Sequence, residues 1–151
     1  MILALLVLLA QVDAPETHDL CTVVKSVVRT SVDGFRAIKG AKHEDSAKTV
    51  SWTAPVRLPG ATTCKVIEYK DGSQPFYGCE MHATSCKLTE AKFLTLVKDV
   101  STCLDAAPKM EDDGKKRTAR LHKGGVPVRA TFKRGTECEF RFFVEPIQQD
   151  H

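Results

Sequence analysis

Residues 63–81 read TCKVIEYKDGSQPFYGCEM and predict a β-hairpin. Apolar and β-branched residues lie on both sides of Asp71-Gly72, a dipeptide that favours tight hairpin turns. A four-residue connection, 70–73, makes Cys64 and Cys79 a directly opposed, non-hydrogen-bonded pair. The Cα atoms of such a pair are about 4.5 Å apart, which is within the range of a disulfide. We therefore expect a Cys64–Cys79 bridge across this hairpin.

Residues 126–145 predict a second hairpin, because apolar and polar residues alternate on both sides of Arg134-Gly135-Thr136. A three-residue loop at this position puts every apolar side chain on one face, whereas a two-residue loop mixes the faces. The expected apolar pairs are Phe132 with Cys138, Ala130 with Phe140, Val128 with Phe142, and Val126 with Val144. The opposite face is expected to carry Arg129 with Arg141, Thr131 with Glu139, and Lys133 with Glu137.

Two segments have the periodic apolar stripe of a buried helix, residues 19–38 and residues 90–106. Thr89 is the expected N-cap of the second helix. Cys21 and Cys103 lie beside these stripes, so we expect them to form a bridge between the helices. Elimination then pairs Cys86 with Cys138.

The remaining strand candidates are residues 49–56 and 117–122, while residues 41–48 and 111–116 are expected to be a polar loop and a charged turn. The order is therefore α-βββ-α-βββ. An antiparallel sheet with two helices packed on one face is the natural packing for this order. The expected fold class is a disulfide-bonded α+β domain.

The N-terminus predicts export. Residues 1–10 carry no charged side chain and are almost wholly aliphatic, with the length of a signal-peptide core and too short to span a bilayer. Residues 1–14 are expected to be a signal peptide, cleaved after Ala10 or Ala14, and residues 15–151 a single domain. The six cysteines that follow, an even number, favour an oxidising compartment, either the periplasm or the exterior. No other segment is long enough to cross a membrane.

Several short motifs resemble those of small uncharacterised secreted bacterial proteins. They are a cysteine in the first helix, Leu58-Pro59-Gly60-Ala61-Thr62-Thr63-Cys64 at a strand start, Tyr77-Gly78-Cys79 in a strand, and Cys103-Leu104 at a helix end. The element order also resembles the TATA-binding-protein-like and secretion-chaperone-like folds. The resemblance implies a fold but no activity. Cys86 and Cys138 lie outside these motifs, as expected of an additional pair.

No motif predicts catalysis, a cofactor or a metal site. Cys79-Glu80-Met81-His82 followed by Cys86 has no standard metal-ligand spacing, and cysteines in an oxidising compartment are expected to be paired. The five histidines are scattered and there is no Gly-x-Ser-x-Gly elbow. Gly124-Gly125 is expected to be a turn, because no phosphate-loop spacing surrounds it.

The C-terminal half is rich in basic residues, although the net charge of the whole chain is only +3. Arg129, Lys133 and Arg141 on the polar face, together with Trp52, are the candidate partner-binding residues. The expected partner is another protein, with weak contact to an anionic surface as a further possibility. Nucleic acid is not expected, because the exposed face is expected to lack interleaved aromatic residues and the compartment is unsuitable.

The sequence therefore predicts an exported, non-enzymatic binding protein, of the inhibitor, immunity, chaperone or envelope-adaptor type. Two alternatives stay open. One is a small exported hydrolase, which would need His82 or His122 within hydrogen-bond reach of a serine or aspartate in a pocket. The other is a structural component of the envelope.

Overall fold

The computed structural model describes residues 19–147, which form two helices and one eight-stranded antiparallel sheet. The expected α+β class is confirmed, and residues 1–14, the expected signal peptide, lie outside the described part. The elements in chain order are α1 (Leu20–Thr30), β1 (Lys42–Asp45), β2 (Thr49–Thr53), β3 (Ala61–Tyr69), β4 (Phe76–Met81), α2 (Cys86–Leu104), β5 (Lys109–Asp112), β6 (Lys116–Lys123), β7 (Val126–Lys133) and β8 (Glu139–Val144).

Helix α1 is shorter than expected. The Asp19 carboxylate caps its start by accepting a hydrogen bond from the Thr22 backbone N–H at 2.9 Å. The helix ends at Thr30, and short 3₁₀ turns replace the expected continuation to residue 38. Gly34 and Phe35 both adopt left-handed backbone angles, with φ of 71° and 65°, which no α-helix can continue.

Helix α2 begins four residues before its expected start. Its N-cap is Ser85, whose hydroxyl accepts from the Leu88 backbone N–H, so Thr89 is not the cap. Thr89 is instead buried in the first turn, where its hydroxyl donates to the Ser85 carbonyl at 2.9 Å. Cys86 consequently lies in the first turn of the helix.

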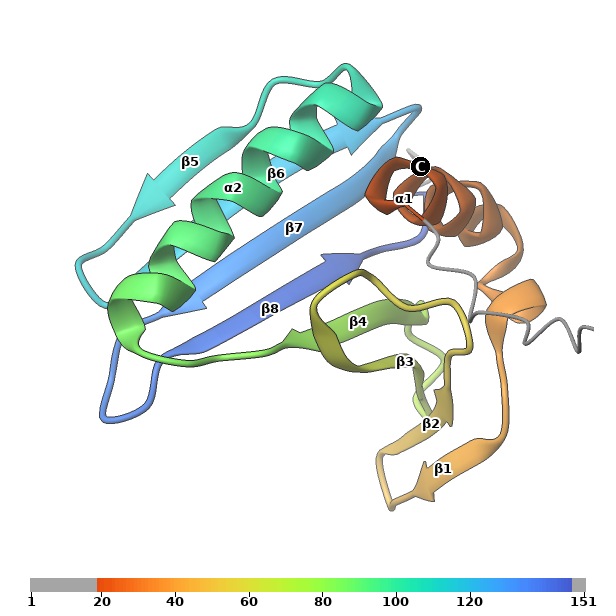
Figure 1. The fold of residues 1–151 in the computed structure, drawn as a ribbon. Helices are drawn as coiled ribbons and strands as arrows, with labels where there is room; N and C mark the ends of the chain where they lie inside the picture. Colours follow the sequence, from red (N-terminus) through yellow and green to blue (C-terminus); the bar gives the residue numbers. More distant parts are fainter. Residues whose placement is uncertain (1–18, 148–151) are drawn as a thin grey trace, which may run out of the picture.

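The strand order is β1-β2-β3-β4-β8-β7-β6-β5, so the sheet consists of two four-stranded meanders joined where β4 pairs with β8 (Figure 1). The expected order α-βββ-α-βββ therefore lacks one strand in each half. The polar segment 41–48, expected to be a loop, contains β1, and the expected charged turn 111–116 contains the second half of β5. Both are short edge strands with only exposed residues, and an apolar pattern cannot reveal such strands.

The two expected hairpin registers had different outcomes. Between β3 and β4, Cys64 pairs with Cys79 and Val66 with Tyr77, as expected. Between β7 and β8, the expected register is wrong by two residues, since Phe132 pairs with Phe140 and Ala130 with Phe142. Cys138 precedes β8 and belongs to a longer connection. A shift of two residues keeps each side chain on its expected face.

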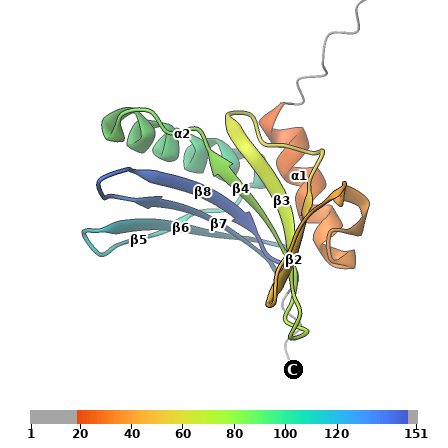
Figure 2. The ribbon, with the colours of Figure 1, turned by 90° about the horizontal axis from the view of Figure 1, so that it is seen from below.

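Both helices contribute to a single apolar core on one face of the sheet. Figure 2 shows α2 on one side of β5–β8 and no helix on the other side of these strands. Alternate residues of β7 and β8 point into the core, among them Val128, Phe132 and Phe142, each about 1% exposed. Their neighbours in the sequence form the helix-free face.

The structure contains three disulfides, which are the expected pairs: Cys21–Cys103, Cys64–Cys79 and Cys86–Cys138. The first joins the start of α1 to the end of α2, the second crosses the β3–β4 hairpin, and the third ties the start of α2 to the β7–β8 connection. They are consistent with an extracellular or otherwise oxidising compartment.

Candidate functional site

The helix-free surface of β5–β8, here called the basic face, carries six cations and two carboxylates. Strand register places them on one side of the sheet. The cations are Lys109, Lys116, Arg120, Arg129, Lys133 and Arg141; the carboxylates are Glu111 and Glu139. The structure thus brings together three of the four candidate partner-binding residues, Arg129, Lys133 and Arg141.

Like charges are directly opposed across the strands of this face. Lys116 pairs with Lys133 and Arg120 pairs with Arg129 between β6 and β7. Arg120 also pairs with Lys109 of β5. Directly opposed like charges destabilise a sheet. Folding stability alone therefore does not explain this arrangement.

The arginines of the basic face are only loosely paired. Arg129 and Arg141 approach carboxylates no closer than 3.7 and 3.8 Å, respectively. Lys116 and Lys133 form no ion pair with another described residue. Their charged groups are therefore available to a partner.

The basic residues on the helix side of the same strands are engaged within the protein. Arg117 lies 2.7 Å from Asp112 and 3.0 Å from Glu90, and Arg134 contacts the same two carboxylates at 3.4 and 3.3 Å. Hydrogen bonds from the Arg117 side chain and from the Gly114 backbone hold the pKa of Asp112 at about 2. This cluster ties α2 to the β5–β6 turn, so these two arginines have a structural role.

A hollow of about 260 Å³ lies within the basic face. Its lining residues are Lys116, Arg129, Thr131, Lys133, Glu139, Arg141 and Phe143. The Arg129 guanidinium lies 4.7 Å from the centre of the Phe143 ring, which holds it against the sheet. The hollow is therefore strongly cationic, with one carboxylate among four cations.

Aromatic side chains continue this face toward β3, contrary to the expectation that it lacks them. The ring centres of Phe143 and Phe76 are 6.0 Å apart, as are those of Phe76 and Tyr69. Phe143 also lies over Gly78, where an added Cβ would come within 3.3 Å of the ring. Sequence reasoning missed this row because its members are distant in sequence and meet only through the β4–β8 pairing.

Trp52 lies apart from the basic face. It pairs with Val66, a core residue, and so points to the helix side of the sheet. The indole is half-buried, and the Lys39 ammonium lies 4.1 Å from its ring centre. The structure thus separates Trp52 from the three basic candidates.

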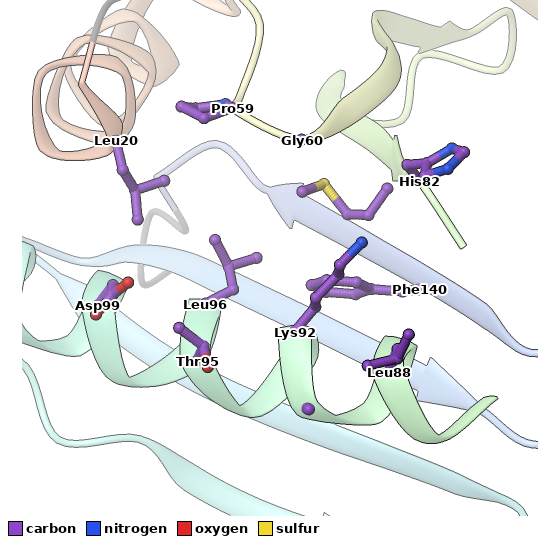
Figure 3. A pocket seen from close by; sticks show the side chains of 12 residues that line it. Leu20, Pro59, Gly60, His82, Leu88, Lys92, Thr95, Leu96, Asp99 and Phe140 are labelled. Carbon is purple, nitrogen blue, oxygen red and sulfur yellow. The ribbon is translucent and has the colours of Figure 1, made fainter. Parts of the chain in front are cut away.

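A second and larger hollow, here called the apolar groove, lies on the helix side and has a volume of about 570 Å³ (Figure 3). Its lining residues are Leu20, Pro59, Gly60, Met81, His82, Leu88, Ala91, Lys92, Thr95, Leu96, Asp99 and Phe140. They come from both helices, from β4 and β8 and from two loops. Sequence reasoning missed the groove because no single segment supplies more than a few of these residues, apart from α2.

The described residues contain no metal-ligand cluster and no membrane-spanning helix. Within residues 19–147, no cluster of three potential metal ligands is present. Cys79 and Cys86 belong to two different disulfides and cannot ligate a metal together. Among these residues, no helix combines the length and apolar character that crossing a membrane requires.

The fold and the two surfaces define a disulfide-bonded α+β protein with a basic sheet face and an apolar groove. Comparison with known proteins gives no match, whether to family models, to curated proteins or to solved structures.

Proposed function

We propose that this protein is an exported, non-enzymatic binding protein whose basic face holds an acidic surface of another protein, in the periplasm or outside the cell. The observation that carries the proposal is the opposition of like charges in the pairs Lys116/Lys133 and Arg120/Arg129. A partner carboxylate placed between two such cations would relieve their repulsion and add charge-assisted hydrogen bonds. The aliphatic N-terminus and the three disulfides support the exported location.

The composition of the surface favours a protein partner over a nucleic acid. Arginine and aromatic residues are enriched at protein interfaces, and Arg129 stacked on Phe143 provides both. Glu139 and Glu111 lie among the cations and would repel a continuous phosphate backbone. Discrete acidic side chains of a protein can avoid these carboxylates.

The hydrolase alternative gains no specific observation. His82 lies at the edge of the apolar groove, but no serine or aspartate hydrogen-bonds to it or to His122 within the part of the chain that the structure describes. A base without a nucleophile or an orienting acid within reach does not make a hydrolytic site.

The proposal is tested with a charge-reversed basic face. The purified protein is immobilised and exposed to the exported proteins of its source, in parallel with the double variant Lys116→Glu/Arg120→Glu. A second double variant, Lys87→Glu/Lys98→Glu, reverses two exposed lysines of α2 and has the same net charge. Each captured protein is then purified and titrated at low and at high salt.

We expect an acidic partner whose affinity for the face variant falls about tenfold or more, equivalent to about 1.4 kcal/mol, while the α2 control binds like the wild type. Added salt should weaken the wild-type complex. Equal affinity of the face variant and the wild type for every captured protein would overturn the proposal. So would tighter binding to a single-stranded oligonucleotide than to any captured protein.

A further inference from the structure

We infer that the apolar groove binds the hydrocarbon chain of a fatty acid, with the carboxylate at the end near Lys92. This site is independent of the basic face and lies on the opposite side of the sheet. Its volume of about 570 Å³ is within the range of small-molecule sites, about 300–1,000 Å³.

Buried apolar side chains of the core form the floor of the groove. Met81, Leu96 and Phe140 line it and are themselves at most 8% exposed. Leu88, which is 56% exposed, lies in the first turn of α2 at one end of the groove.

The groove is elongated, because α2 lines it from Leu88 to Asp99. At 1.5 Å per residue, this length is about 16 Å. Pro59 and Gly60 of the β2–β3 loop form the opposite wall, and Leu20 of α1 closes one end (Figure 3). This shape fits an extended chain better than a compact ring system.

The lining chemistry favours a hydrocarbon chain over a peptide. An extended peptide of this length has about five residues, each with a backbone N–H and C=O to satisfy. Apart from His82, Lys92, Thr95 and Asp99, the lining side chains have no hydrogen-bonding group. Burying peptide groups against them would be costly, whereas a saturated chain has no polar group to satisfy.

Lys92 and Asp99 place charges of opposite sign at two positions along the groove. Lys92 forms no ion pair with another described residue and points into the groove between Leu88 and Leu96, one helical turn from Leu88 (Figure 3). Asp99 lies about 10 Å farther along the helix axis, near Leu20. An anionic head group is therefore favoured beside Lys92 and disfavoured near Asp99.

The inference is tested with the purified protein and carbon-14-labelled dodecanoic acid below its micellar concentration. Dodecanoic acid and dodecanol serve as unlabelled competitors. Thr95→Trp places an indole in the groove, and Leu94→Trp places one on the neighbouring exposed position of α2, outside the groove. Lys92→Glu reverses the charge at the head-group end, and Lys98→Glu is its control on the same helix.

We expect saturable binding that dodecanoic acid displaces. Thr95→Trp should weaken it about tenfold or more because the indole fills the space of the chain, and Leu94→Trp should leave it unchanged. Lys92→Glu should weaken fatty-acid binding several-fold, unlike Lys98→Glu. The double variant Lys116→Glu/Arg120→Glu should bind the probe like the wild type, so that this result and the test of the basic face are independent.

Three outcomes would overturn the inference. The first is the absence of saturable binding by the folded wild-type protein. The second is equal binding by Thr95→Trp and the wild type, which would place the probe elsewhere. The third is that dodecanol displaces the probe as effectively as dodecanoic acid does, which would show that Lys92 does not bind the carboxylate.

Discussion

Tyr77 shows how one residue joins the two halves of the sheet to the β2–β3 loop. Its ring is fully buried, and its hydroxyl donates a hydrogen bond to the Val56 carbonyl at 2.8 Å. Burial raises the pKa of the phenol far above its usual value, so the hydroxyl stays a neutral donor. The loop that contains Val56 leads to Pro59 and Gly60, which form one wall of the apolar groove.

The substitution Tyr77→Phe removes this donor and leaves the Val56 carbonyl without its partner. We expect the free energy of unfolding to fall by about 1 kcal/mol, measured by urea denaturation. Tyr69→Phe is the matched control, because Tyr69 is 42% exposed and should tolerate the same change without loss. Equal stability of Tyr77→Phe and the wild type would show that this hydrogen bond contributes nothing.

At the scale of elements, the opposed cations make the β6–β7 strand pair less stable than a pair with alternating charges would be. Replacing Lys116 by glutamate alternates the charges along the row formed with Lys133 and Glu139, and Arg120→Glu does the same between Lys109 and Arg129. Each change should raise the free energy of unfolding by about 0.2–1 kcal/mol. The gain should shrink at high salt.

Chemical denaturation of the two single variants at low and high salt measures this gain. Lys123→Glu is a suitable control, because Lys123 lies opposite Val126 and its reversal creates no such pair. A variant that is more stable yet binds its partner less tightly would mark the basic face as a functional surface. A loss of stability in both variants would mean that the opposed cations do not repel one another.

The elements also show what a sequence pattern can and cannot predict. The Cys64–Cys79 register was predictable, because Asp71-Gly72 fixes the turn and two cysteines mark the pairing. The β7–β8 register was not, because a shift by two residues keeps the same faces and the apolar pattern cannot distinguish the two. The caps of α2 were ambiguous for a similar reason, since Ser85 and Thr89 are both good N-cap residues.

The same limits apply to the candidate sites. Alternation along β7 and β8 predicted that Arg129, Lys133 and Arg141 share a face, because side-chain direction in a strand follows from position. The aromatic row depends on the β4–β8 pairing, and the apolar groove on the placement of α1 and two loops against α2. Both require tertiary contacts between segments far apart in the chain, and no local pattern encodes them.

At the scale of the whole molecule, two of the three disulfides tie together segments that the hydrogen-bonded sheet does not. Cys21–Cys103 closes a loop with a sequence separation of 82 residues, Cys86–Cys138 one of 52 and Cys64–Cys79 one of 15. If a bridge stabilises mainly by restricting the unfolded chain, the two long loops contribute about 4 kcal/mol each and the short one about 3 kcal/mol. The Cys64–Cys79 bridge also spans strands that already pair in the sheet.

We therefore expect the variant Cys21→Ser/Cys103→Ser to be less stable than Cys64→Ser/Cys79→Ser in urea denaturation. The first bridge joins the start of α1 to the end of α2, and Leu20 beside it closes the apolar groove. Its loss should thus also weaken fatty-acid binding at denaturant concentrations where both variants remain folded. Peptide mapping without reduction checks the premise, since a peptide linking Cys21 to Cys64 would contradict the bridge pattern. A larger loss of unfolding free energy in Cys64→Ser/Cys79→Ser than in Cys21→Ser/Cys103→Ser would show that local strand pairing, and not loop closure, decides the contribution of each bridge.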